Sequence, residues 1–182
     1  MSEQRRGDPI GTYTGGEFHP LDPDPERIEL PDIANGLANT CRYAGQCQFY
    51  YSVGTHSIYV SEELSEHGPT IQLYGLFHDA AEAYISDVPR PVKREIETFE
   101  RIEQRILAAV WDRLGVDPPT ESEWEVVMDA DDRLFHYEAD TLLAEFEPPS
   151  VPDLPYELSA CSPERVREQF LDRAEQLRAD ME

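Results

Sequence analysis

The chain of 182 residues is long enough for one domain with a hydrophobic core, and its 40% apolar content is typical of a globular protein. No apolar run approaches the length of a membrane span, the first residues lack the apolar stretch of a secretory signal, and the three cysteines form no CxxC pair. These features argue against a membrane protein, a secreted protein and a disulfide or cysteine-zinc framework, so we expect a cytoplasmic protein with reduced thiols.

Acidic residues dominate the charge of the chain: there are 38 Asp and Glu against 15 Lys and Arg, which gives a net charge of −23. This charge would repel the phosphates of DNA or RNA, so nucleic acid is not an expected partner. An ordinary acidic surface is one interpretation. Lys93 is the single lysine, however, and this scarcity favours a halophilic protein of a high-salt cytoplasm, where salt screens the repulsion between carboxylates.

Residues 1–26 are rich in Gly, Pro and Asp, and a Gly-Gly turn between short aromatic-bearing runs predicts a small N-terminal β-hairpin or extended arm. Further along the chain the apolar spacing is helical, and the helices are separated by short loops. The predicted helical segments are one from Leu30 to the RYAGQCQ loop, then 52–66, 70–85, 92–114, 121–146 and one that begins at Ser162. We therefore predict an all-α bundle in which residues 27–182 form one domain.

The stretch GLFHDAAEAYISD, residues 75–87, places titratable residues beside a buried helical stripe. His78 and Glu82 are four residues apart, and Asp79 and Glu82 are three apart. On a helix, all three side chains can therefore reach one point. Taken alone, this group is also compatible with a solvated helix edge that carries a hydrogen-bonded histidine.

Two further polar residues interrupt apolar faces of other predicted helices. His56 lies between Val53 and Val60 on the buried face of the 52–66 segment, where a lone histidine is more often a hydrogen-bonded core residue than a ligand. Asp131 interrupts the apolar face of the 121–146 segment. An unpaired buried carboxylate is costly, so Asp131 must be paired, protonated or bound to a cation.

One divalent metal ion would satisfy all of these residues together. His56, His78, Asp79 and Asp131 offer two imidazoles and two carboxylates, a donor set that suits Mn, Fe, Co, Ni or Zn better than Ca. Four protein ligands on an ion that prefers five or six leave places for water and a substrate oxygen. Such a water is acidic enough to act as a nucleophile near neutral pH, so we expect a hydrolytic metal centre.

The order His56, His78-Asp79, Asp131 resembles that of the HD-domain metal-dependent phosphohydrolases. The segment HDAAEAYISDVPRPVK is similar to the subgroup related to bacterial 5′-deoxynucleotidases, which hydrolyse deoxynucleoside monophosphates. The resemblance covers roughly residues 30–145. The positions that match the subgroup are Glu82, Asp87, Pro89, Pro91, Lys93 and, upstream, the arginine-aromatic pair Arg42-Tyr43.

This resemblance implies an HD-type helical domain, a homodimer, and a metal-bound water that attacks the phosphate ester of a (deoxy)nucleoside 5′-monophosphate. Two alternatives remain. One is hydrolysis of a triphosphate or signalling nucleotide, which the lack of large insertions disfavours. The other is a non-catalytic, metal-bound nucleotide sensor, which would not need Glu82 and Asp87.

The resemblance also implies roles around the metal. Asp87 would orient the attacking water and Glu82 would carry a proton to the leaving oxygen, although either could instead fix the metal histidines. Arg42 and Lys93 would bind the phosphate; the alternative for Arg42 is a surface residue that caps a helix. Tyr43 would lie by the sugar or base. The best-studied relatives carry tryptophan at the position of Tyr43, so the preference for deoxyribose or ribose stays open.

Basic residues cluster where the predicted 92–114 helix begins. Arg90, Lys93 and Arg94 oppose the dipole of that helix. They would either admit a phosphate to the metal or pair with Glu95 and Glu97. The sequence does not decide between these two interpretations.

Overall fold

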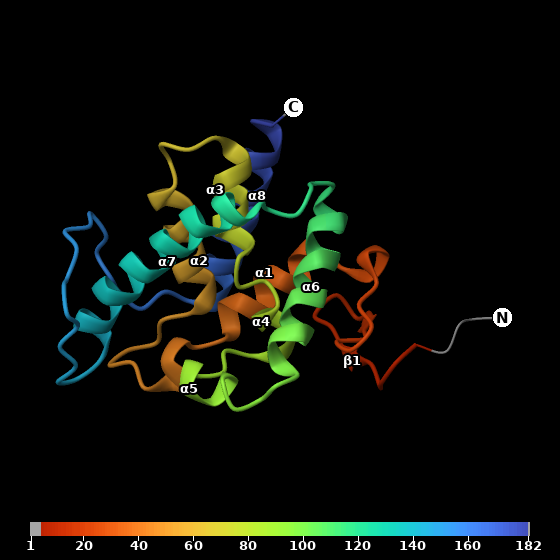
Figure 1. Ribbon diagram of the computed structural model, residues 1–182, viewed down its shortest axis with the longest axis horizontal. Helices are drawn as coiled ribbons and strands as arrows, with labels where there is room; N and C mark the ends of the chain where they lie inside the picture. The colour runs from red at the N-terminus through yellow and green to blue at the C-terminus, as the bar shows by residue number, and fades with distance from the viewer. Residues whose placement is uncertain (1–4, 182) are drawn as a thin grey trace.

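The computed structural model describes residues 5–181 and confirms an all-α bundle with a small N-terminal hairpin (Figure 1). Strands β1 (Ile10–Gly11) and β2 (Glu17–Phe18) pair antiparallel. Phe18 is fully buried and stacks on Tyr84 at 3.8 Å between ring centroids, which anchors the hairpin to the helices. Of the predicted arm, residues 1–4 lie outside the described chain. Within residues 5–181, no helix combines the length and apolar character needed to cross a membrane.

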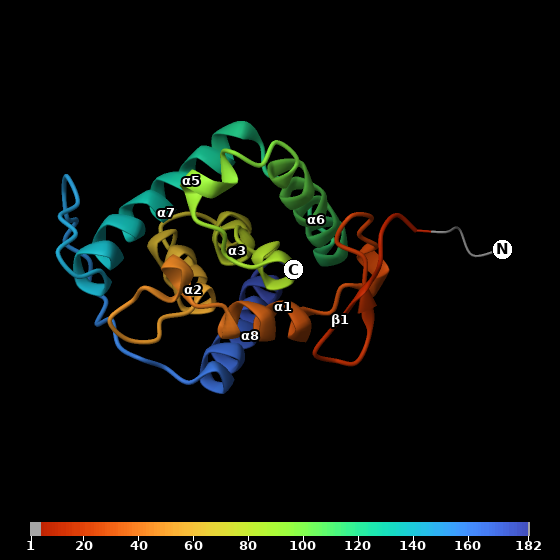
Figure 2. The ribbon, with the colours of Figure 1, turned by 90° about the horizontal axis from the view of Figure 1, so that it is seen from below.

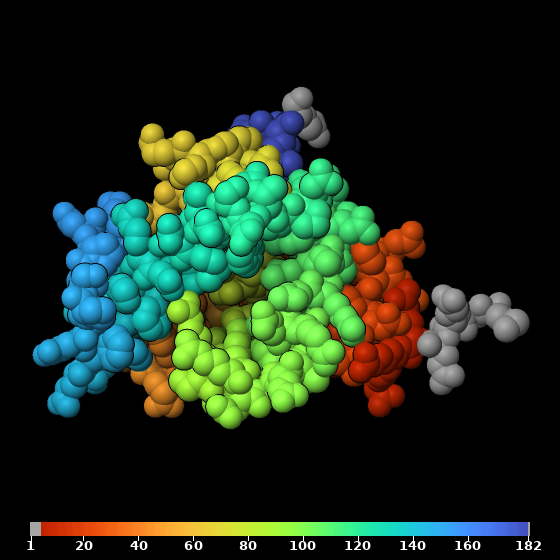
Figure 3. All heavy atoms as spheres, viewed as in Figure 1, coloured from red at the N-terminus to blue at the C-terminus, as the bar shows by residue number. Residues whose placement is uncertain are grey.

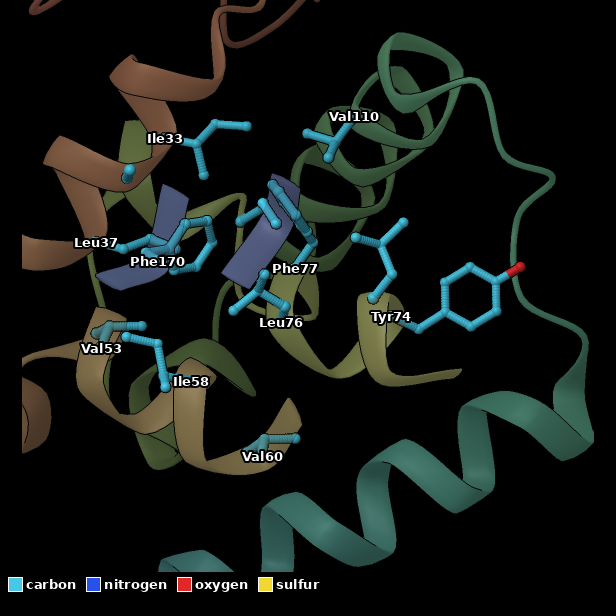
Figure 4. Close-up of a cluster of buried hydrophobic side chains, with 14 of the residues drawn as sticks. Ile33, Leu37, Val53, Ile58, Val60, Tyr74, Leu76, Phe77, Val110 and Phe170 are labelled. Carbon is cyan, nitrogen blue, oxygen red and sulfur yellow. The ribbon is translucent and has the colours of Figure 1, made fainter. Parts of the chain in front are cut away.

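Four helices build most of the hydrophobic core: α1 (Leu30–Asn39), α2 (Val53–Glu63), α3 (Pro69–Phe77) and α8 (Pro163–Ala179). Although α8 comes last in the chain, it packs against the other three. Phe170 of α8 meets Phe77 of α3 edge-on at 5.1 Å between ring centroids, and both side chains are fully buried (Figure 4). This packing fixes the helices from which the polar residues project.

Side-chain caps explain where three helices start. Ser52 and Ser162 each accept a hydrogen bond from an amide three residues further on, at the starts of α2 and α8. Helix α7 (Glu121–Leu142) begins with a capping box between Thr120 and Glu123. The predicted starts of these three helices are confirmed. Two of the predicted ends are too late, because α2 ends at Glu63 and α7 at Leu142.

The continuous helix predicted over 70–85 is wrong, because α3 ends at Phe77 and a short α4 (Glu82–Ile85) follows a turn. In an unbroken helix the carbonyl of Gly75 would accept a hydrogen bond from the amide of Asp79. Here that carbonyl lies 2.7 Å from Nδ1 of His78. The side chain of His78 thus takes a main-chain acceptor at the point where the helix ends.

The continuous helix predicted over 92–114 is also wrong. The chain forms a short α5 (Arg90–Lys93), then turns, then α6 (Phe99–Leu114). No residue of α5 is buried, and Val92 and Ile96 are both exposed, so packing does not hold this segment to the axis of α6. Figure 2 shows α6 and α7 on either side of α3.

Helix α1 contributes no predicted site residue, yet it fixes the position of α4. The two helices pack together at Gly36. A Cβ atom at position 36 would lie 2.6 Å from the carbonyl oxygen of Ala83, closer than real Cβ atoms approach a neighbour. Glycine therefore allows the two backbones to meet one residue from Glu82.

Candidate metal centre

Four side chains from three parts of the fold meet at one point. His56 comes from α2, while His78 and Asp79 lie in the turn after α3, and one ligand atom of each lies within 4.8 Å of the others. Asp131 on α7 joins them, because its Oδ1 lies 3.0 Å from Nε2 of His56 and 3.9 Å from Nε2 of His78. The structure therefore brings together all four residues that the sequence predicted as metal ligands.

The second ring nitrogen of each histidine fixes how the first one points. Nδ1 of His56 lies 2.8 Å from Oε1 of Glu138, and Nδ1 of His78 lies 2.7 Å from the carbonyl oxygen of Gly75. Each Nε2 atom faces a carboxylate, Asp131 at 3.0 Å from His56 and Asp79 at 3.2 Å from His78. Neither contact has hydrogen-bonding geometry, so both Nε2 atoms are buried without a hydrogen-bond partner. A neutral histidine whose Nδ1 donates a proton presents a lone pair at Nε2, so this donor set fits a divalent metal ion.

The charges of this cluster shift one another's pKa values. Burial disfavours a charged imidazole, but Asp79 and Asp131 outweigh it and raise the pKa of His78 to about 9. Burial would also raise the pKa of both carboxyl groups. The two histidines outweigh it, so that the pKa of Asp79 falls well below its ordinary value and that of Asp131 falls to about 2. Both aspartates are therefore ionised, and their buried negative charges favour the binding of a cation.

Glu138 is a buried member of the site that the sequence analysis missed. Its Oε1 accepts a hydrogen bond from the hydroxyl of Tyr51 at 2.8 Å, and its Oε2 lies 3.1 Å from a guanidinium nitrogen of Arg42. Burial raises the pKa of Glu138, but His56 and Arg42 outweigh it and lower the pKa overall. A signal was present, because Glu138 follows Asp131 by seven residues and so returns to the same inward face of α7.

Arg42 is buried in the centre of this network, so the alternative of a surface arginine is wrong. Its side chain bridges Glu138 and Asp79, the latter at 3.8 Å. The next residue, Tyr43, has a left-handed backbone (φ 54°, ψ 35°) that is uncommon outside glycine. Its ring lies 5.9 Å from that of Phe135, between centroids. The strained turn thus places an arginine and an aromatic ring side by side.

The predicted catalytic residue Glu82 is buried next to the cluster. Its Oε1 lies 3.0 Å from Nζ of Lys93, which also lies 2.7 Å from Oε1 of Glu103. Its Oε2 is buried without a hydrogen-bond partner. Burial raises the pKa of Glu82 well above its ordinary value, and the carboxylates of Asp79 and Asp87 add to this effect. Lys93 therefore pairs with acids of α4 and α6, and the alternative pairing with Glu95 or Glu97 is wrong for this residue.

Arg90 reaches the same site from α5. Its guanidinium lies 3.0 Å from Oδ2 of Asp131 and 3.1 Å from Oδ1 of Asp132, and its side chain is 53% exposed. The two aspartates are adjacent in sequence but differ in environment: Asp131 is buried, and the side chain of Asp132 is 59% exposed. The inward orientation predicted for Asp131 is thus observed.

A pocket of about 770 Å³ opens over these residues. Figure 3 shows the hollow on this face of the molecule, between α5, α6 and α7. Every residue predicted for the site lines it except His56, which is fully buried: Arg42, Tyr43, His78, Asp79, Glu82, Asp87, Lys93 and Asp131. A small molecule can therefore reach the cluster from solvent.

Comparisons with known proteins find relatives without a known activity, and no family model matches the chain. The chain is similar to the uncharacterized protein YfdR of Escherichia coli, at 34% identity over 109 residues, which is 60% of this chain and 60% of YfdR. It is also similar to an uncharacterized protein of Rhodobacter capsulatus, at 38% identity over 110 residues, which is 57% of this chain and 56% of that protein. The matches thus span less than two thirds of either relative.

Proposed function

We propose that the chain is a metal-dependent phosphohydrolase of the HD-domain type that cleaves the phosphate ester of a (deoxy)nucleoside 5′-monophosphate. The observation that carries this proposal is the pair of buried Nε2 atoms of His56 and His78. Neither atom has a hydrogen-bond partner, both face ionised aspartates, and His78 lines a pocket that also contains basic side chains. A purely structural histidine cluster would not need an open pocket beside it.

His56, His78, Asp79 and Asp131 would hold one divalent transition metal ion. The ion would supply a water acidic enough to attack phosphorus near neutral pH. Neighbouring residues would support these ligands. Glu138 and the Gly75 carbonyl orient the imidazoles, and Arg42 balances the charge of the buried carboxylates.

The basic residues would bind the phosphate, and the remaining acids would move protons. Arg90 and Lys93 line the pocket beside the cluster and offer charge-assisted hydrogen bonds to phosphate oxygens, with Arg42 behind them. Glu82 lines the pocket and has an Oε2 without a hydrogen-bond partner, and it would hand a proton to the leaving oxygen. Asp87 lines the same pocket and would orient the attacking water.

The proposal is tested by elemental analysis of the purified protein together with phosphate release from nucleoside mono-, di- and triphosphates. We expect a bound transition metal and phosphate release from monophosphates. His78→Ala should lose both the metal and the activity, whereas the exposed His67→Ala should keep both. Metal without turnover of any nucleotide would instead favour the sensor, and preferential turnover of triphosphates would favour the other hydrolase.

Glu82→Ala separates a proton carrier from a metal ligand. The variant should keep its metal and lose roughly 100- to 10,000-fold in turnover, since general acid catalysis contributes about that much. If Glu82→Ala empties the site, then Glu82 binds the metal and the role proposed for it is wrong.

A further inference from the structure

The pocket changes its chemical character along its length. On α6, the residues that line it run from Glu100 and Glu103 at the end near Lys93 to Trp111 at the other end. On α7, they run from Phe135 and Asp131 at the metal cluster back to Trp124 near the start of the helix. The two helices therefore form walls that are charged at one end and apolar at the other.

The apolar end is lined by side chains with almost no hydrogen-bonding capacity: Leu107, Trp111, Pro118, Pro119, Trp124 and Met128. Among these six, only the two indole N–H groups can donate a hydrogen bond, and no side chain carries a charge. A ligand group that binds here is therefore recognised by its shape and its apolar faces.

This end of the pocket is built on the rigid core of the protein. Trp111 is 3% exposed and meets Tyr74 edge-on at 5.4 Å between ring centroids. The hydroxyl of Tyr74 donates a hydrogen bond to the carbonyl of Asp117 at 2.9 Å, which fixes the α6–α7 connection ahead of its two prolines. Figure 4 shows the ring of Tyr74 pointing from α3 toward that connection. The apolar walls are thus formed before any ligand arrives.

The two ends are separated by the length of one nucleoside. Trp124 precedes Asp131 by seven residues on α7, a rise of about 10 Å. A group whose phosphate lies at the metal cluster can therefore extend a ring system to Trp124.

We infer that the apolar end binds the aromatic base of the phosphate ester by stacking against Trp124, and that it prefers the larger purine ring to a pyrimidine without reading the polar edge of either. The inference rests on the proposed function for the position of the phosphate. It adds a binding subsite for the base. It also adds a preference for purines over pyrimidines, because a larger ring covers more of the apolar wall. Stacking of a base on an aromatic side chain is insensitive to sequence, because every base has a π-face.

The test uses nucleosides, because they need neither metal nor turnover. The chain has two tryptophans and both line the apolar end, so the two indole N–H signals in an NMR spectrum report on this subsite alone. Adenosine should shift both signals and saturate at a lower concentration than cytidine. Ribose 5-phosphate, which lacks a base, should shift neither. Equal shifts with ribose 5-phosphate and adenosine would overturn the inference.

Substitution of Trp124 provides the second arm. Trp124→Ala, followed through the remaining Trp111 signal, should bind adenosine about 5- to 150-fold more weakly, which corresponds to ~1–3 kcal/mol of stacking. Trp124→Phe should restore most of the loss, and Tyr13→Ala, which removes an exposed aromatic side chain outside the pocket, should change nothing. Unchanged adenosine binding by a folded Trp124→Ala protein would also overturn the inference.

The two proposals can fail separately. Adenosine binding at Trp124 without hydrolysis of any nucleotide would remove the proposed function and leave the subsite. Hydrolysis of nucleotides without any shift of the indole signals would leave the function and remove the subsite.

Discussion

The two histidines of the candidate site and Arg90 all approach the carboxylate of Asp131, but the protein holds them in opposite ways. His56 and His78 are fixed from behind by Glu138 and by a main-chain carbonyl, and all of these contacts are buried. Arg90 extends from α5, a four-residue helix without a single buried residue, and its side chain is 53% exposed. One half of the site is embedded in the core, while the other half lies on a surface segment.

This difference suggests a division of labour within the proposed function. Metal ligands work best when their geometry is fixed before the ion binds, because an orientation fixed by neighbouring groups costs nothing at the moment of binding. Phosphate-binding side chains must follow a group that enters and leaves, so a weakly packed segment suits them. Each of the following predictions probes one half of the site and leaves the other as its reference.

The largest effect is expected from pH, and it acts on the buried half. In the metal-free protein the pKa of His78 is raised from 6.5 to about 9, so a proton must leave before the ion can bind. We expect metal affinity to rise by up to about tenfold per pH unit across that window. Titration of Mn or Co by calorimetry at several pH values measures it, and an affinity that is independent of pH would contradict the prediction.

The raised pKa of His78 has the opposite effect on the stability of the metal-free protein, which should fall as the pH rises. Because the folded-state pKa of His78 is raised, its stabilising contribution is complete below pH 6.5 and is lost as the pH rises through about 9. The melting temperature should therefore respond to pH in opposite directions in the absence and the presence of metal.

Glu138→Gln tests the anchor of His56. The substitution keeps the shape of the side chain but removes the charge that holds Nδ1 of His56 and pairs with Arg42. We expect metal affinity to fall by about 10- to 100-fold, as when other partners of metal-bound histidines are removed. Asp140→Asn, an exposed change on the same helix, should leave the affinity unchanged. Calorimetric titration of both variants makes the comparison.

Arg90→Ala tests the exposed half. Loss of one charge-assisted contact should raise KM for a nucleotide by about tenfold, or ~1.4 kcal/mol, while the metal content stays normal. Arg94→Ala, an exposed change in the same segment and outside the pocket lining, should have no effect on KM. If Arg90→Ala loses the metal instead, then its contact with Asp131 belongs to the buried half of the site.

The smallest effect is expected from Asp132→Asn. Its side chain is 59% exposed and contacts Arg90 but neither histidine, whereas its neighbour Asp131 is buried against both of them. Metal affinity should not change, and the free energy of unfolding should shift by about 0.5 kcal/mol or less. Thermal or denaturant unfolding measures the stability. A variant without metal would show that Asp132, and not Asp131, is the ligand.

The helical spacing of apolar residues was sufficient to predict the bundle and the inward orientation of Asp131, and the Gly-Gly turn predicted the hairpin. It failed at the turn after Phe77 and at the break between α5 and α6. At the first of these, the apolar spacing does not show that the side chain of His78 competes with the amide of Asp79 for the carbonyl of Gly75. At the second, the periodic pattern continues through a segment that no tertiary packing supports.

The candidate site divides along the same line. The four proposed ligands could be chosen from the sequence because each of them interrupts or borders an apolar stripe. Glu138 was missed although it shares the face of Asp131, because a charged residue on a charged helix attracts no notice. The burial of Arg42 depends on the strained turn at Tyr43, and no local pattern predicts it. The halophilic interpretation stays a prediction from composition.

Gly36 has a consequence for genetics. A random search for loss of function would be expected to recover substitutions of histidine and aspartate. Yet any side chain at position 36 would collide with the backbone of Ala83 and displace the acid beside it. A Gly36→Ala allele would therefore have the phenotype of a catalytic lesion, although it lies on a helix that touches no substrate and changes no chemical group of the site. The proposed activity thus depends on the absence of a side chain at position 36 as well as on the reactive side chains of the site.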